Sequence, residues 1–236
     1  MPAFVSPSYL HDKSPENKIE TQPRPALARL LSQCRSGSKR VYLARQSDIL
    51  EMLLPAFGVL SQGCLITTPT GPVAIEDLQL GDEIQSPGGE ARQIEWIGEA
   101  LVNPGAIDLP WLRRVQSDRF GFTRPSVDTV LGRGAELVAG PDSAQAKPLG
   151  EYGTDELIVE VSPPAPVRLF QIACQDPCNI LVNGLPLRVL DPVSFMQEKP
   201  ESFRETFRAM MPNGSLPVSD PKPWIAASPN RREYLA

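Results

Sequence analysis

Histidine is almost missing from this sequence, because the 236 residues contain only one, His11. Histidine is the usual general base near neutral pH and the commonest metal ligand. Triad hydrolases, histidine-rich zinc sites and two-histidine iron sites all need a well-placed imidazole. His11 lies in a stretch rich in proline, serine and charge that we interpret as a disordered tail, where a base cannot be held in register. The sequence therefore argues against these classes of enzyme and metal centre.

Long apolar runs and an excess of basic residues are also lacking. No run of 18 or more apolar residues occurs, so we expect no membrane span. The net charge of −5 gives no basic excess to drive binding to the phosphate backbone, so we expect no nucleic-acid partner. The N-terminus lacks a charged start followed by an apolar block, which argues against a secretory signal. We expect a cytoplasmic protein, with export without a signal peptide as the alternative.

Cysteine is sparse, and its spacing does not suit a metal site. Cys34 and Cys64 are isolated, and Cys174 and Cys178 form one C-x3-C pair, which is not a zinc pattern. No histidine is available to complete a two-cysteine site, so we expect no metal and no cofactor. Reduced thiols are typical of such a chain. For Cys174 and Cys178, which flank Gln-Asp-Pro, simple packing is favoured and a local disulfide is the alternative.

Proline is abundant instead, with 26 residues, roughly twice the usual share. Each proline removes a backbone donor and fixes φ, which disfavours long helices. From residue 59 to about 192, short apolar runs alternate with turn sequences such as PTG, LGD, PGG and VNG. This pattern predicts an all-β fold, either barrel-like or a sandwich.

The chain divides into four parts by composition. Residues 1–24 are interpreted as a tail or linker, and residues 25–56 as a short helical flank. Residues 57–195 form the predicted β domain. Residues 196–236 are predicted to contain one helix followed by a proline-rich tail.

The predicted helices depend on apolar spacing. In the N-terminal flank, the helical spacing of four residues predicts one helix, and the segment from Asp48 to Pro55 predicts a second. The four residues are Leu27, Leu30, Leu31 and Cys34. The C-terminal helix is predicted from four apolar residues on one face, which we interpret as a packing face. These four residues are Phe203, Phe207, Met210 and Met211.

The most informative motif is VLSQGCLITTPTGPVAIEDLQLGDEI, residues 59–84. Gly71 and Gly81 lie in predicted tight turns, where a residue without Cβ takes a positive φ at little cost. Asp82 can bond nearby backbone amides and fix its turn. We therefore interpret these three as structural turn residues, and favour a scaffold of two hairpins over a catalytic role for Glu76 or Asp82.

This stretch resembles the opening of the Hedgehog/intein (Hint) domain family, in particular the stand-alone Hint-like modules of bacterial proteins. A second match follows in the same order, in QIEWIGEA. The resemblance implies a Hint-like β-fold over about residues 57–195, with short helical flanks at both ends. The matching positions are Gly63, Ile66, Thr68, Gly71, Glu76, Leu78, Gly81, Asp82, Ile84, Ile94, Trp96, Ile97 and Gly98.

In self-processing members of this family, a Cys, Ser or Thr attacks the preceding carbonyl while a histidine in a second block protonates the scissile amide. The resemblance places Val59 at the nucleophile position and Asp128, in TRPSVDTVL, at the histidine position. Valine has no nucleophilic atom, and an unperturbed carboxylate, with a pKa of about 4, cannot donate a proton at neutral pH. We therefore predict a degenerate, non-catalytic binding or structural module, with a protein as its expected kind of partner. The vestigial positions Val59, Thr68 and Asp128 should share one cleft.

The alternative is an autoprocessing domain that uses Cys64, at the family's Thr position, for an N–S acyl shift at the Gly63–Cys64 peptide. No histidine or positive neighbour lowers the pKa of this thiol, and a small apolar residue at the start of a strand is the simpler interpretation. A third class, a hydrolase with paired carboxylates such as Glu76 and Asp82, has no spacing that singles the pair out.

Overall fold

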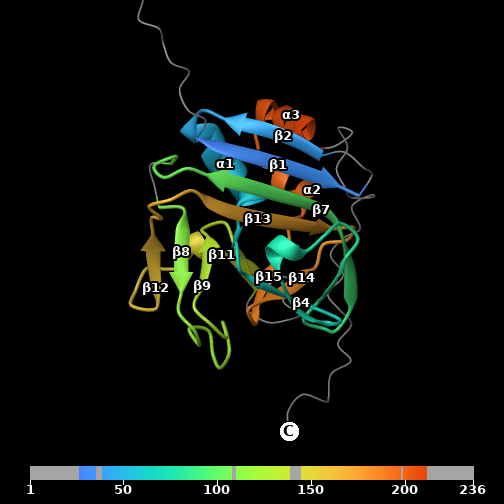
Figure 1. The fold of residues 1–236 in the computed structure, drawn as a ribbon, viewed down its shortest axis with the longest axis vertical. Coiled ribbons are helices and arrows are strands. Elements are labelled where there is room, and N and C mark those ends of the chain that lie inside the picture. Colours follow the sequence, from blue (N-terminus) through green and yellow to red (C-terminus); the bar gives the residue numbers. More distant parts are fainter. Residues whose placement is uncertain (1–26, 36–38, 108–109, 139–144, 198, 212–236) are drawn as a thin grey trace, which may run out of the picture.

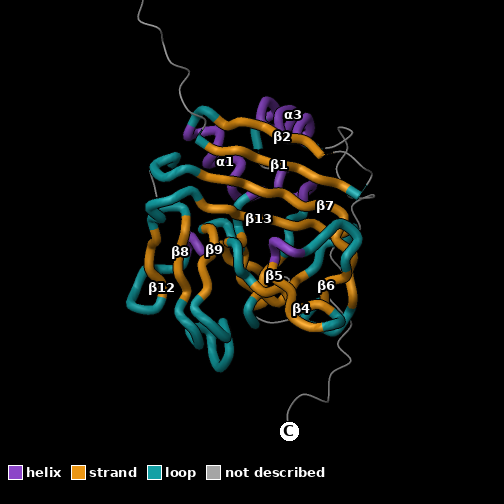
Figure 2. The backbone as a smooth tube through the Cα atoms, viewed as in Figure 1, coloured by secondary structure: helices purple, strands orange, loops and turns teal. Residues whose placement is uncertain are grey.

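The computed structural model describes residues 27–35, 39–107, 110–138, 145–197 and 199–211. This part of the chain is built from two antiparallel β-sheets with few helices, as Figure 1 and Figure 2 show. The all-β prediction is therefore confirmed. None of the helices in these ranges is long and apolar enough to cross a membrane.

The larger sheet is nine-stranded. Its strands are β1 (Ala28–Cys34), β2 (Lys39–Ala44), β3 (Leu60–Ser61), β6 (Glu83–Gln85), β7 (Ala91–Val102), β8 (Leu112–Val115), β9 (Thr129–Gly132), β12 (Ile158–Val161) and β13 (Val167–Cys174). The strand order is β12-β8-β9-β3-β13-β7-β1-β2, with β6 pairing β7 off this path. The short strand β3 thus lies between β9 and β13, which come roughly 70 and 110 residues later in the sequence.

The smaller sheet is six-stranded, and three short helices follow or precede the strands. Its strands are β4 (Leu65–Thr68), β5 (Gly71–Ala74), β10 (Glu136–Val138), β11 (Ala146–Pro148), β14 (Asn179–Val182) and β15 (Leu185–Arg188), in the order β11-β10-β15-β14-β4-β5. The α-helices are α1 (Ser47–Phe57), α2 (Pro192–Gln197) and α3 (Glu201–Met210), and two 3-10 turns cover Ile75–Asp77 and Leu149–Glu151.

The larger sheet separates two hydrophobic cores. Because side chains alternate along a strand, Leu169 and Ala173 of β13 pack on the side of the three helices. Phe170 and Ile172 of the same strand pack on the opposite side, against the smaller sheet. In the helical core the ring of Phe57 meets that of Trp96 edge-on at 5.3 Å.

The predicted helix over residues 27–34 is wrong, because this segment is strand β1. Its seven residues pair with β7, from Ala28 opposite Val102 to Cys34 opposite Trp96, and six of them pair with β2 on the other side. The long strand β7 would otherwise have an open edge there, and tertiary pairing outweighs local propensity. The N-terminal flank is therefore strand, strand and helix, and it belongs to the larger sheet.

The other two predicted helices are confirmed. Helix α1 includes the segment from Asp48 to Pro55. Helix α3 buries Phe203, Phe207 and Met210, and the Phe207 ring lies 6.2 Å from that of Phe57. The predicted tail over residues 1–24 and the proline-rich segment after residue 211 lie outside the described residues.

The turns of the motif adopt the geometry that their residues favour. Gly71 has a φ of 122° and Gly81 a φ of 89°, a region that costs side-chain-bearing residues energy. The Asp82 carboxylate accepts a hydrogen bond of 2.7 Å from the Gln79 amide. These three residues therefore hold the connections that follow β4 and precede β6.

Candidate functional site

The position that the Hint resemblance assigns to the nucleophile lies between α1 and β3. Val59 is 2% exposed. Its N–H donates to the carbonyl of Phe170 at 3.0 Å, and its carbonyl accepts from the amide of Gly132 at 2.7 Å. Val59 therefore has both backbone groups bonded to neighbouring strands, and its side chain offers no atom that could attack a carbonyl.

The peptide bond before Val59 is closely surrounded. The Gly58 carbonyl, which a nucleophile at residue 59 would attack, accepts a hydrogen bond of 2.8 Å from Trp111 Nε1. A Cβ at Gly132 would lie 2.4 Å from that carbonyl oxygen and 2.6 Å from Trp111 Nε1, so the space admits only glycine. Sequence reasoning missed Trp111 and Gly132, because nothing local in the sequence connects them to residue 58.

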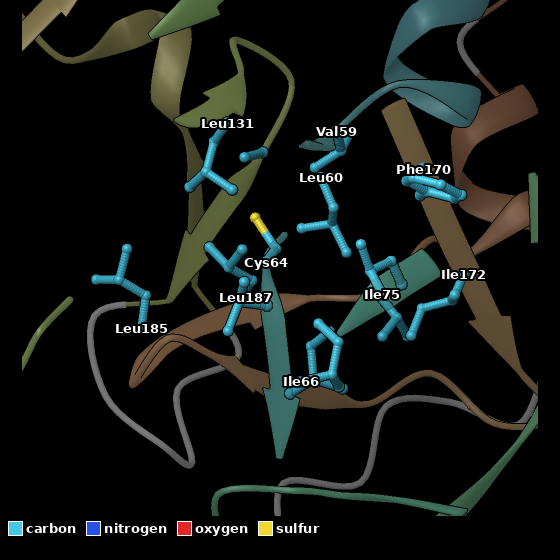
Figure 3. Packing of buried hydrophobic residues seen from close by; sticks show 14 of the residues in the cluster. Val59, Leu60, Cys64, Ile66, Ile75, Leu131, Phe170, Ile172, Leu185 and Leu187 are labelled. Carbon is cyan, nitrogen blue, oxygen red and sulfur yellow. The ribbon is translucent and has the colours of Figure 1, made fainter. Parts of the chain in front are cut away.

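Cys64, the alternative nucleophile, is enclosed by the apolar core. Figure 3 shows its sulfur among Leu60, Leu131 and Leu187, and the residue is 2% exposed. Its Sγ lies 3.7 Å from Ser61 Oγ and 3.7 Å from the Val130 carbonyl oxygen. Burial raises the pKa of this thiol to about 11. The thiolate that would act as nucleophile is therefore strongly disfavoured at neutral pH.

The two carboxylates considered for a hydrolase each bond to a backbone amide. Glu76 Oε2 accepts from the Gly63 amide at 2.8 Å, and Asp82 Oδ2 accepts from the Gln79 amide. The first contact links Gly63 to the 3-10 turn that contains Glu76, and the second lies within the turn that precedes β6. Each carboxylate thus has a structural partner, which agrees with the scaffold interpretation of the motif.

The expectation that Asp128 lies beside Val59 stays a prediction, and the polar contacts of the Asp128 side chain are with other residues. The Asp128 carboxylate accepts from the Ser117 amide at 3.0 Å and lies 3.8 Å from the Arg114 guanidinium. Gly132, the residue bonded to Val59, comes four residues later, about 13 Å along an extended strand. The Asp128 side chain is 48% exposed, so it points away from the core.

Thr68 has a local partner as well. Its Oγ1 donates to the Gly71 carbonyl at 2.6 Å and lies 3.1 Å from Thr70 Oγ1. These bonds close the turn between β4 and β5. The side-chain hydrogen bonds of Thr68 and Asp128 thus join each of them to a neighbouring turn.

The residue after Asp128 points inward instead. Thr129 is 1% exposed, and its Oγ1 accepts from Asn183 Nδ2 at 2.9 Å. The Asn183 Oδ1 in turn accepts from the Leu65 amide at 2.9 Å. Asn183 and Gly184 form the turn between β14 and β15, as VNG predicts, with φ values of 47° and 84°. Because strand side chains alternate, a shift of one residue moves a side chain from the core to the surface.

The cysteine pair at the end of β13 is unbridged. Cys174 and Cys178 are both buried free thiols, as the packing interpretation predicts. A hydrogen bond with the Cys178 thiol, together with burial, raises the pKa of Cys174. Within the described ranges, no three His, Cys, Asp or Glu side chains come close enough to hold a metal ion.

The fold is an antiparallel two-sheet domain in which residue 59 leads directly into strand β3 of the larger sheet. The family model for the Hint domain matches residues 59–187. This match spans more than half of the chain, and the protein therefore belongs to the Hint domain family. The expected Hint-like β-fold is confirmed.

Solved structures of similar fold are inteins and an intein-like domain. The MchDnaB-1 intein shares 14% identity, with a TM-score of 0.39 over 56% of this chain and 99% of its own. The bacterial intein-like domain from Clostridium thermocellum shares 14% identity, with a TM-score of 0.42 over 57% of this chain and 99% of its own. The gp41-1 intein shares 12% identity, with a TM-score of 0.39 over 55% and 97%. No curated protein matches this chain.

Proposed function

We propose that this protein is a Hint domain that does not process itself and that acts as a binding or structural module. One observation carries the proposal: the family match begins at residue 59, and this residue is a buried valine. An acyl shift starts with attack by a side-chain oxygen or sulfur on the preceding carbonyl, and valine has neither atom.

The packing of the segment before Val59 supports the same proposal. Strands β1 and β2 and helix α1 all precede residue 59, yet β1 pairs with β7 along its whole length. Phe57, two residues before Val59, is fully buried against Trp96. Cutting the chain at Val59 would leave its upstream part integrated in the larger sheet. Cleavage at Val59 would therefore not release the upstream segment from the domain.

No observation favours the alternative in which Cys64 is the nucleophile. Burial raises the pKa of the thiol to about 11, and its two polar contacts, with Ser61 and Val130, include no base. The Cys64 nitrogen, which would have to receive a proton when the Gly63–Cys64 bond breaks, donates its hydrogen to the Ser61 carbonyl at 3.2 Å and has no acid beside it among these contacts.

Intact mass measurement tests the proposal directly. The purified wild-type chain is incubated with dithiothreitol or with hydroxylamine, which intercept a thioester. We expect one species near 25.8 kDa in both. Two fragments whose masses sum to that of the chain plus one trapping molecule, in wild type but not in Cys64→Ala, would overturn the proposal in favour of autoprocessing at Cys64. Fragments that persist in Cys64→Ala at a junction next to Val59 would overturn it as well.

A further inference from the structure

Strand β2 forms one end of the larger sheet. Among the described residues its sole strand partner is β1, and Figure 1 shows it at the outer margin of the sheet. An edge strand presents a row of backbone N–H and C=O groups that another chain can pair with. Val41 and Leu43 on this strand are 55% and 56% exposed. The edge therefore combines open backbone groups with two apolar side chains on one face.

The opposite face of β2 is anchored. The Tyr42 hydroxyl and Arg40 Nη1 both donate to the carbonyl of Ala209 at the end of α3, the latter at 2.8 Å. Because side chains alternate along a strand, these bonds leave Val41 and Leu43 on the free side. The edge is thus held in an extended conformation, which lowers the entropy cost of adding a further strand.

The charged residues of strand β2 and its C-terminal neighbour Arg45 all have one sign. The segment KRVYLAR, residues 39–45, has three basic residues and no acidic one, and Arg29 of β1 lies opposite Leu43. In the part of the chain that the structure describes, neither Arg29, Lys39, Arg40 nor Arg45 forms a salt bridge. The chain as a whole carries a net charge of −5, so this basic edge contrasts with the rest of the protein.

The same charge argues against a second copy of this chain as the occupant. An antiparallel β2–β2 pair centred on Tyr42 would place Lys39 opposite Arg45 in both halves of the pair. Like charges directly opposite each other on neighbouring strands are destabilising. A strand carrying acidic residues beside apolar ones would instead match both the charge and the exposed side chains.

We propose that β2 binds an extended acidic segment of a partner protein by strand addition, with alternate apolar residues of that segment covering Val41 and Leu43. This inference names a partner class for the binding role proposed above and rests on it. Main-chain hydrogen bonds would supply affinity and the side chains specificity. Because the experiment below measures binding and not cleavage, its failure would leave the mass test of self-processing unaffected.

The probe is the labelled peptide acetyl-Glu-Val-Thr-Val-Glu-Ile-Glu-amide, titrated with the full chain by fluorescence anisotropy at about 0.05 M salt. A second peptide replaces each Glu with Lys, and a third carries N-methyl groups on alternate residues, which block one edge of the strand. We expect the acidic peptide to bind at least about tenfold more tightly than either, a difference of about 1.4 kcal/mol. Hydrogen exchange of residues 40–44 should slow on its addition.

Charge reversal locates the site. Lys39→Glu combined with Arg45→Glu should weaken acidic-peptide binding by about tenfold or more. The matched control, Arg124→Glu with Lys147→Glu, changes the net charge equally at exposed positions far along the chain, and should bind within about twofold of wild type. Equal affinity for all three peptides, or equal loss in both double variants, would overturn the proposal. A wild-type dimer seen by light scattering, together with no binding of the acidic peptide, would overturn it in favour of a second copy.

Discussion

The indole Nε1 of Trp111 donates a hydrogen bond of 2.8 Å to the carbonyl oxygen of Gly58. This carbonyl is the one that a nucleophile at residue 59 would attack, and N–H donors aimed at such an oxygen are what stabilise a developing oxyanion. In this chain the neighbouring residue is Val59, so the donor serves to satisfy a buried carbonyl. The contact also fixes the end of α1 to the start of β8.

Trp111→Phe should destabilise the fold. The ring volume is largely kept, but the buried Gly58 carbonyl loses its donor, which costs about 1–3 kcal/mol. Urea unfolding measures the change in the free energy of unfolding. Thr206→Ala is the control, because its hydroxyl bonds the Ser202 carbonyl on an exposed helix surface, and its effect should stay within about 0.5 kcal/mol. Equal losses in the two variants would contradict a structural role for the indole bond.

Placing the Cys and His that the Hint resemblance calls for at residues 59 and 128 should not produce cleavage. We expect Val59→Cys combined with Asp128→His to stay at one mass in dithiothreitol, because residue 128 is exposed and about 13 Å along the strand from Gly132. A proton donor at that distance cannot supply the factor of about 10²–10⁴ in rate that general acid catalysis contributes. Intact mass and circular dichroism measure cleavage and folding together. Thiol-dependent cleavage next to residue 59 in the folded double variant, and not in Val59→Cys alone, would contradict the placement of Asp128.

Asn183 should tolerate glycine better than alanine. Both variants lose the bonds from the Asn183 side chain to Leu65 and Thr129, and both should be destabilised by about 1–3 kcal/mol. Alanine also has to adopt the φ of 47° seen at this position, which adds about 1–2 kcal/mol. Urea unfolding of the two variants side by side gives the difference. If Asn183→Ala proves as stable as Asn183→Gly, the positive φ at this position does not explain which residues it tolerates.

The buried thiols should make the fold less stable at high pH. Burial raises the pKa of both Cys34 and Cys64 from 9.0 to about 11. The folded chain then holds these protons more tightly than the unfolded chain. This contribution to stability is full below about pH 9 and is lost as the pH rises towards about 11. Urea unfolding across that range measures the slope of stability against pH.

Cys64→Ala provides the control for this slope, because lysine, tyrosine and arginine side chains titrate in the same range in both proteins. The stability of the variant should fall less steeply with pH than that of wild type. In parallel, native Cys64 should resist alkylation at about pH 8 and react once the chain is unfolded. Rapid labelling of native Cys64 would contradict the buried, protonated thiol.

Local sequence signals predicted the parts of this fold that neighbouring residues determine. Gly71, Gly81 and Asp82 lie in turns because their conformational and hydrogen-bonding preferences act over a few residues. The helix from Asp48 to Pro55 and the buried face of α3 followed from apolar spacing within one segment. The Hint resemblance came from two short motifs in the same order, and the family match over residues 59–187 shows that it was correct.

The other features of the fold depend on pairing between strands that lie far apart in the sequence. The segment over 28–34 has apolar residues that suit either a helix or a strand, and it becomes β1 because β7, some 60 residues later, supplies its partner. Asp128 and Thr129 are adjacent in sequence, but the register of β9 sends one to the surface and the other to Asn183. The Trp111–Gly58 bond and the open edge of β2 depend on strand order, which sequence patterns of period two cannot encode. The sequence by itself determined the family, the turns and the presence of a valine at residue 59, whereas the tertiary structure determined which side chains surround that residue.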